Sequence, residues 1–176
     1  PYRRQRQMCI RDSPYTKDKG ASLGAPLIDH LVGTYENPPR STVAQAYDFI
    51  IETLEEAVTL MSEEKNNGRM NKYAARALLA RIYLYHDDNR KAFDLADQLI
   101  KDADTSGSYA LYPHEKYVAA WSVEAKFGSE SFFEIANSVD DTPGRDSWGY
   151  LLNWYGYQKG FVTQKYAEQM LADPGD

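Results

Sequence analysis

The stretch GRMNKYAARALLARIYLYHDD, residues 68–88, has the apolar period of one amphipathic helix. Alanine is dense within it, and small side chains let neighbouring backbones approach closely. We therefore expect a central helix that packs against other helices on more than one side, with Leu78 and Ile82 in the core and Arg76 and Arg81 on the remaining face. The expected apolar stripe contains Ala74, Ala75, Leu78, Leu79, Ile82 and Tyr85.

This stretch is the second of three expected helices, with one helix before it and one after it. Thr42 and Gln45 have the spacing of a capping box, and Asn71 is placed to cap the central helix. Asn89 is the expected cap of the third helix, which follows a turn so short that the second and third helices must be antiparallel neighbours. The flanking stripes are Val43, Tyr47, Ile50, Leu54, Ala57 and Met61, then Ala92, Phe93, Ala96, Leu99 and Ile100. The acids Glu52, Glu55 and Glu56 lie off the first stripe and are expected on a solvated face.

The hairpin of the second and third helices matches part of the tetratricopeptide pattern, through Leu79, Ala80, Tyr83 and Ala92. Arg76 and Ala96 stand where that pattern has Trp and Phe, and no 34-residue copy is apparent. The expected fold class is therefore mainly α, with tetratricopeptide-like hairpins, irregular loops and one or two short strands. Residues 131–135 alternate and are the best strand candidate, and residues 109–112 form a short extended piece.

Residues 1–13, PYRRQRQMCIRDS, differ from everything after them and resemble translated sequencing-adapter reads. A genuine basic arm is the alternative. The whole chain has 20 basic and 26 acidic residues; this segment holds four Arg and one Asp, which leaves 16 and 25. It also holds Cys9, the only cysteine. The remaining acidic, cysteine-free chain offers no disulfides and no basic footprint for nucleic acid.

Four segments follow from this pattern. Residues 1–13 are the adapter-like segment, 14–42 an irregular lead-in rich in Gly and Pro, 43–103 the helices, and 104–176 an aromatic-rich loop and strand region with a final helix near 163–171. Together they are expected to form one incomplete domain. No stretch reaches the roughly 20 consecutive apolar residues of a membrane span, and no secretory signal is visible.

Residues for catalysis or metal binding are sparse. His30, His86 and His114 are scattered without a helical ligand pair, so no metal site is expected; His86, at a helix end, is better explained as a partner of the helix dipole. No glycine-rich phosphate loop occurs. We expect no enzyme and no cofactor, and a glycosidase fragment with two suitably spaced carboxylates is the least favoured reading.

The aromatic stretch WGYLLNWYGY, residues 148–157, is the only candidate binding site. Indole and phenol rings stack on the C–H faces of sugars, and amides and carboxylates bind the hydroxyl rim. The alternative is that these rings fill a seam between loops and helices. The candidate ligand-binding residues are Trp148, Tyr150, Asn153, Trp154, Tyr155, Tyr157 and Asp146.

The order of features from about residue 20 to 176 resembles the SusD/RagB family of outer-membrane nutrient-binding lipoproteins. The residues that carry this resemblance are Gly24–Leu27, Arg40–Val43 with Tyr47 and Ile50, Glu55, Ala57 and Met61, Gly68–Lys72 with Ala74–Ala75, Leu78–Tyr85, Lys91–Ala96 with Ile100, Tyr109–Leu111, Glu130–Ile135 and Asp173–Asp176.

The resemblance implies a superhelix of tetratricopeptide-like pairs in a Bacteroidota-type cell. It implies surface capture of an oligosaccharide, polysaccharide or peptide and delivery to a SusC-like TonB-dependent transporter in the outer membrane. Family chains are about three times as long, so this chain resembles a middle fragment. Contact with the membrane would be only through a lipid anchor that this sequence lacks.

Two classes of function remain open. The first is a non-enzymatic glycan-binding module that supplies a transporter, and the aromatic stretch favours it. The second is a tetratricopeptide-type adaptor that binds a protein or peptide in a concave groove, which the missing repeat copies disfavour.

Overall fold

The computed structural model describes residues 14–65, 68–120, 126–135, 144–152, 155–157, 160 and 163–172. The chain divides into two compact units, Pro1–Glu134 and Ile135–Asp176, and each is described by itself below. The first unit contains η1 (Tyr15–Lys17), α2 (Val43–Leu60), α3 (Lys72–Tyr85), α4 (Asn89–Ser106) and α5 (His114–Ala120). The second contains η2 (Gly144–Asp146), α6 (Trp148–Leu152) and α7 (Gln164–Leu171). The fold is mainly α, as predicted.

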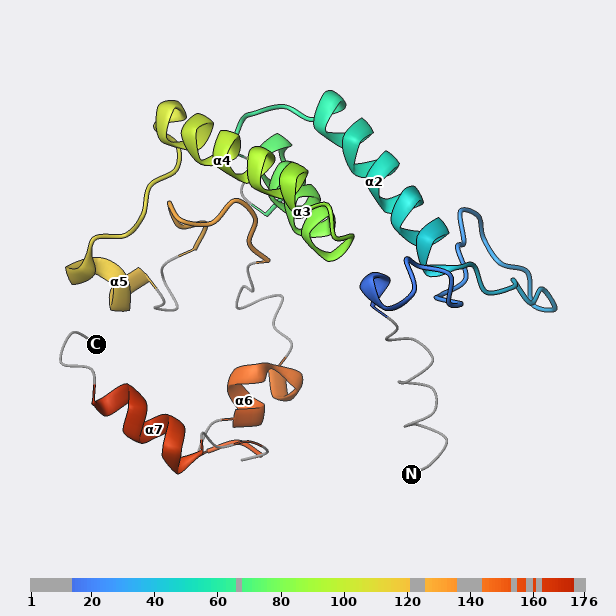
Figure 1. Ribbon diagram of the computed structural model, residues 1–176. Helices are drawn as coiled ribbons and strands as arrows, with labels where there is room; N and C mark the ends of the chain where they lie inside the picture. The colour runs from blue at the N-terminus through green and yellow to red at the C-terminus, as the bar shows by residue number, and fades with distance from the viewer. Residues whose placement is uncertain are drawn as a thin grey trace. The chain divides into compact units, whose positions relative to one another are not determined.

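The three expected helices are present, and α3 lies between the other two. It packs against both α2 and α4, and a three-residue turn joins it to α4 (Figure 1). The buried alanines of α3, Ala74, Ala75 and Ala80, allow this close approach on two sides. The predicted antiparallel hairpin and the central position of α3 are therefore confirmed.

The helix caps follow the sequence closely. Thr42 and Gln45 form the predicted capping box at the start of α2, with Gln45 N donating to Thr42 Oγ1 over 3.1 Å. Asn71 caps α3 by accepting from Ala74 N at 3.0 Å. The predicted cap of α4 was wrong by one residue, because Asp88 accepts from Lys91 N and Asn89 is already helical. Both residue types cap well, so local sequence alone does not separate them.

The buried face of α3 differs from the predicted stripe. Leu79 and Tyr83 are 5% and 6% exposed, whereas Leu78, which we expected in the core, is 38% exposed. Tyr85 is exposed as well, and Ile82 is only partly buried. The buried face of α3 passes through Tyr83. Its ring can be buried because its hydroxyl group donates a hydrogen bond to Glu55 of α2. Leu54, Leu79, Tyr83 and Ala92 form the first core cluster.

A second cluster lies where α3 and α4 meet the chain after α4. Its buried members are Tyr73, Leu99, Ala103 and Tyr109, and Phe132 packs against them. The other expected members of the α4 stripe, Phe93 and Ile100, are 65% and 59% exposed, because the buried face runs through Ala92, Leu99 and Ala103.

The strand expected at residues 131–135 is not formed. A turn replaces it, in which Ser131 N donates to the Gly128 carbonyl over 3.2 Å. Phe132 then turns onto Tyr109 and Tyr73, with ring centroids 4.9 and 6.1 Å away. An alternating pattern needs a partner strand, and here a ring cluster takes the aromatic side chain instead.

The lead-in before α2 is irregular, as expected, but is tied to the helices. Leu23 and Thr42 form an isolated antiparallel bridge, and Arg40 Nε donates to the Gly24 carbonyl over 2.7 Å. Gly20 has a φ of +78° and passes so close to α2 that an added Cβ would lie 2.6 Å from Ala44 N. A side chain at position 20 would push the lead-in off the helix.

The lead-in also carries a loop closed by a histidine. His30 bonds Asp29 through Nδ1 and Glu36 through Nε2, each over 2.8 Å. Glu36 also accepts from Gly33 N over 3.1 Å. These contacts define what we call the His30 clasp.

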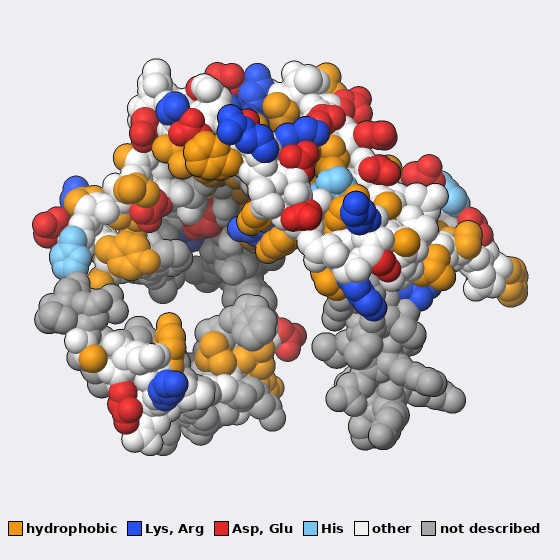
Figure 2. Space-filling model, in the orientation of Figure 1, with side chains coloured by type: hydrophobic (Ala, Val, Ile, Leu, Met, Phe, Trp, Pro, Cys, Tyr) orange, Lys and Arg blue, Asp and Glu red, His pale blue; other side chains and the backbone are white. Residues whose placement is uncertain are grey.

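One ion pair of the first unit joins α3 to α4. Arg76, expected on the face left over from the apolar stripe, is largely buried and donates to Asp102 of α4 over 2.6 Å. This bond, together with one from Gln98, lowers the pKa of the Asp102 carboxyl. Elsewhere the face seen in Figure 2 mixes acidic and basic side chains over the helices, with hydrophobic ones between them.

Candidate functional site

The aromatic segment begins with a short helix held at its start by Ser147. Ser147 Oγ accepts from Tyr150 N over 3.1 Å, and its carbonyl accepts from Leu151 N over 2.9 Å. Asp146 ends the neighbouring η2, which packs against α6. Part of the segment that we expected to be a loop is therefore helical, over Trp148–Leu152. Ser147 is the residue that the sequence reasoning missed, and its position before an apolar run was the available signal.

Two of the predicted binding residues meet across a tight turn. Tyr157 N donates to the Tyr150 carbonyl over 3.1 Å, and the two rings meet edge to face with centroids 5.3 Å apart. Gly156 makes this possible, since an added Cβ would lie 1.7 Å from the Tyr150 carbonyl oxygen. The backbone spacing thus requires glycine at position 156.

Exposure within the turn suits a surface that contacts a ligand. Tyr155 is 90% exposed and Tyr157 49%, whereas Tyr150 is partly buried. Exposed phenol rings offer a flat apolar face together with a hydroxyl group. The structure thus brings together Tyr150, Tyr155 and Tyr157, with Asp146 on the adjoining η2. Asn153 and Trp154 lie outside the described residues, as does the side chain of Trp148.

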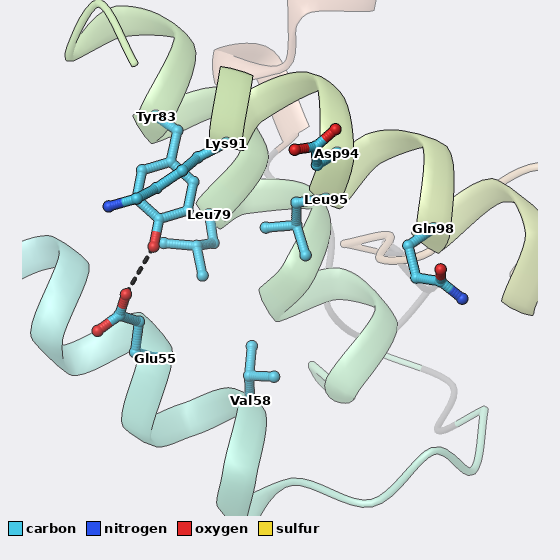
Figure 3. A pocket seen from close by; sticks show the side chains of 8 residues that line it. All are labelled: Glu55, Val58, Leu79, Tyr83, Lys91, Asp94, Leu95 and Gln98. Carbon is cyan, nitrogen blue, oxygen red and sulfur yellow. Dashed lines mark hydrogen bonds between the residues drawn. The ribbon is translucent and has the colours of Figure 1, made fainter. Parts of the chain in front are cut away.

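A second candidate site is a groove of about 430 Å³ between the helices of the first unit (Figure 3). Glu55 and Val58 of α2, Leu79 and Tyr83 of α3, and Leu95 of α4 surround it. The floor is apolar, and charged side chains of both signs stand at its rim. A groove of this kind suits an apolar side chain or a neighbouring helix better than a sugar, because few polar groups converge in it.

The hydrogen bond from Tyr83 to Glu55 crosses this groove over 2.6 Å, as the dashed line in Figure 3 shows. Burial, and then the hydrogen bond and charge of Glu55, raise the pKa of Tyr83 to about 12. Lys91 Nζ lies 5.2 Å from the centroid of the same ring. Glu55 is exposed, as expected of a solvated face, and its carboxylate also accepts a hydrogen bond from the buried Tyr83 phenol on the neighbouring helix.

Within the described ranges, no three His, Cys, Asp or Glu side chains stand where they could hold a metal ion. No helix in that part of the chain is long and apolar enough to cross a membrane.

Comparison with known proteins gives one family match. A family model described as SusD-like, starch-binding associating with outer membrane, matches residues 13–84. Among curated protein sequences, no significant match to the chain is found.

Solved structures extend this likeness over nearly the whole chain. A protein of Bacteroides vulgatus ATCC 8482 for which sugar binding is proposed is 38% identical, with a TM-score of 0.84 over 94% of this chain and 37% of its own. A SusD superfamily protein of Bacteroides thetaiotaomicron VPI-5482 is 31% identical, with a TM-score of 0.78 over 94% of this chain and 36% of its own. A SusD-like carbohydrate binding protein of B. vulgatus ATCC 8482, 24% identical with a TM-score of 0.64 over 82% of this chain and 30% of its own, shares the fold. The chain therefore spans between 30% and 37% of the length of these proteins.

Proposed function

This chain matches a segment of SusD-like proteins in both sequence and fold, and on that premise we propose that the protein binds an oligosaccharide or polysaccharide without chemically altering it. The observation that carries the proposal is the 38% identity and TM-score of 0.84 to a protein for which sugar binding is proposed. The family description of starch binding in association with the outer membrane supports it.

We place the ligand on the aromatic segment, residues 146–157. The exposed rings of Tyr155 and Tyr157 would stack on sugar faces, and Asp146 would accept hydrogen bonds from sugar hydroxyls. The two tryptophans and Asn153 belong to the proposed surface by their place in the sequence. A loop positioned by a short capped helix and a glycine-dependent turn is a suitable carrier for such groups.

A glycan array followed by retardation in polysaccharide-containing gels tests this proposal. Trp148→Ala and Trp154→Ala should each weaken binding by about 1–3 kcal/mol, on the scale of bases stacked on aromatic side chains, with little change in melting temperature. A buried Trp would instead lose about 3–5 kcal/mol of folding stability. Collapse of the melting temperatures with unchanged binding would place both tryptophans in the core and remove the proposed site.

Tyr155→Ala has a matched control in Tyr35→Ala. Tyr35 is 95% exposed and lies in the lead-in loop of the other unit. Loss of retardation for Tyr155→Ala alone supports the assignment. An equal loss for both variants would show that retardation reports general surface apolarity.

We also propose that the protein works at the outer membrane surface and passes its ligand to a SusC-like TonB-dependent transporter. The family description supports the membrane association. Co-purification with the product of a neighbouring transporter gene, from detergent-solubilised outer membranes, tests the partnership. Recovery of the protein without any transporter, in cells grown on the bound glycan, would contradict it.

A further inference from the structure

A hollow of about 300 Å³ opens at the C-terminal end of α4, in the first unit. Three segments line it: the last turns of α4, the extended piece that includes Tyr109, and the turn that carries Phe132. Ala103 and Tyr109, both 6% exposed, are its buried members. Ala110 N donates to the Ser129 carbonyl over 3.1 Å, which ties the second and third segments together. The volume falls at the lower end of ordinary ligand pockets.

Apolar side chains surround the hollow where it meets solvent. Ile100 is 59% exposed and Leu111 83%, and both line it. Large apolar side chains held at the edge of a preformed hollow are typical of interaction sites. The occupant should therefore have an apolar part that covers these two side chains.

The charges of the hollow are negative. Asp104 and Glu130 line it, and among the described residues neither carboxylate takes part in an ion pair. Glu130 accepts from Tyr112 N with one oxygen, over 3.3 Å, which leaves the other oxygen available. The last turn of α4 has no basic residue, although the carbonyl end of a helix favours one and an acid there is unfavourable.

Lys65 lies near the Tyr109 ring, but its ammonium group is bonded to a backbone carbonyl outside the hollow. Lys65 Nζ donates to the Gly128 carbonyl over 2.7 Å and lies 4.8 Å from the Tyr109 ring centroid. Burial lowers its pKa, while the charge of Glu134, not of Glu130, opposes that shift. The negative potential of the hollow is thus left for a cation from outside.

We propose that this hollow binds a lysine or arginine side chain from an extended segment of a partner protein. The aliphatic stem would pack on Ile100 and Leu111, and the cationic head would meet Asp104 and Glu130. A sugar ring fits less well, because the walls are mainly apolar and the Tyr109 ring is too buried to offer a stacking face. The site lies in the first unit and is independent of the proposed glycan surface in the second.

The test uses the ¹⁵N-labelled protein and a six-residue peptide amide, acetyl-Gly-Leu-Lys-Leu-Gly-Ser. Its amide-shift changes should centre on residues 100–111 and 129–132. The same peptide with an acetylated lysine keeps the stem and loses the charge. It should bind about fivefold more weakly, which is the upper end of the contribution expected from an exposed ion pair. Equal affinity of the two peptides would overturn the proposal.

Matched variants locate the charge. Asp104→Asn and Glu130→Gln should each weaken binding of the lysine peptide and leave binding of the acetylated peptide unchanged. Glu56→Gln removes one carboxylate at an exposed position of α2, outside the hollow, and should have no effect on binding of either peptide. Thermal melting of each variant checks folding. Unchanged lysine-peptide binding by the double variant, or shifts at these residues caused by a chitosan oligomer and not by the peptide, would show that the assignment is wrong.

Discussion

Tyrosines of the helical core and tyrosines of the aromatic segment differ in exposure. In the first unit Tyr83 and Tyr109 are 6% exposed, and in the second Tyr155 and Tyr157 are 90% and 49% exposed. Tyr83 and Tyr109 each have a hydroxyl partner, Glu55 for Tyr83 and Asn71 for Tyr109, at 2.6 and 2.7 Å. A distant residue that satisfies the hydroxyl group offsets the cost of burying it. Residue type alone therefore does not decide whether a tyrosine belongs to the core or to the surface.

The largest expected effect tests the buried side of this comparison. Leu79→Ala should lower the free energy of unfolding by about 2–5 kcal/mol, because it opens a cavity between α2, α3 and α4. Leu78→Ala, one position along the same helix, is the matched control and should cost less than about 1 kcal/mol, since that side chain is half-exposed. Urea melts of the three proteins give the values. Equal costs would mean that the phase of α3 is misassigned.

A smaller loss of folding stability is expected on substitution of Asn71, which is 2% exposed and bonds both α3 and the segment after α4. Its Oδ1 caps α3, while Nδ2 donates to Tyr109 Oη over 2.7 Å and to the Glu64 carbonyl over 3.1 Å. Asn71→Ala should cost about 1–3 kcal/mol through the lost cap and the unpaired hydroxyl. Asn71→Ser keeps the cap and loses the long-range donor. Its free energy of unfolding from urea melts should therefore lie between those of the parent and of Asn71→Ala. A Ser variant as unstable as Ala would assign the whole effect to the Tyr109 contact.

On the exposed side of the comparison, Gly156→Ala should change binding more than folding. The added methyl group would force the Tyr150–Tyr157 turn open and displace Tyr155. We expect polysaccharide affinity to fall by about 1 kcal/mol, the lower end for loss of a stacked ring. Gly33→Ala is the control, because an added Cβ there meets nothing nearer than 3.8 Å. Affinity gels measure both, and a parent-like Gly156→Ala would exclude this turn from the ligand surface.

The smallest effect concerns the fully exposed His30 clasp. Hydrogen bonds that its ring donates to the Asp29 and Glu36 carboxylates raise the pKa of His30 above its ordinary value of 6.5. The pKa of Glu36 is lowered from 4.5, first by its bond to Gly33 N and then by His30. The raised pKa gives stability that is present below 6.5 and lost as pH rises through the folded value. The lowered carboxyl pKa gives stability that is lost as pH falls below 4.5.

The clasp should therefore be tightest between about pH 4.5 and 6.5. NMR titration of the His30 ring should show a pKa above that of Glu36→Gln, in which one carboxylate is absent. A His30 pKa that does not move in the variant would show that Glu36 contributes nothing to the clasp.

Local sequence was sufficient for the three helices and for the starts of α2 and α3. Thr42 with Gln45, and Asn71 before an alanine-rich run, are signals that depend only on residues within one turn. The burial of Tyr83 and the exposure of Leu78 were not predictable in this way, because the partner Glu55 lies on another helix. Phe132 illustrates the same limit: its alternating surroundings indicate a strand, yet rings 23 and 59 residues earlier determine where it packs.

The candidate site was predictable as a composition and only in part as a geometry. Five aromatic residues in ten marked the segment, and their lack of period suggested a loop. The helix at Trp148–Leu152 and the Tyr150–Tyr157 contact depend on Ser147 and Gly156. Both are small residues that act on the backbone of Tyr150, so their effect depends on how closely the folded chain passes that residue.

The three-residue turn between α3 and α4 has a consequence for the order of folding. Contacts between these helices close short loops, so their entropic cost is small and they can form early. The ring cluster of Tyr73, Tyr109 and Phe132 closes much longer loops and must form later. During synthesis the α3–α4 hairpin can therefore assemble while Phe132 has yet to leave the ribosome, and the second core cluster then closes onto a surface that already exists.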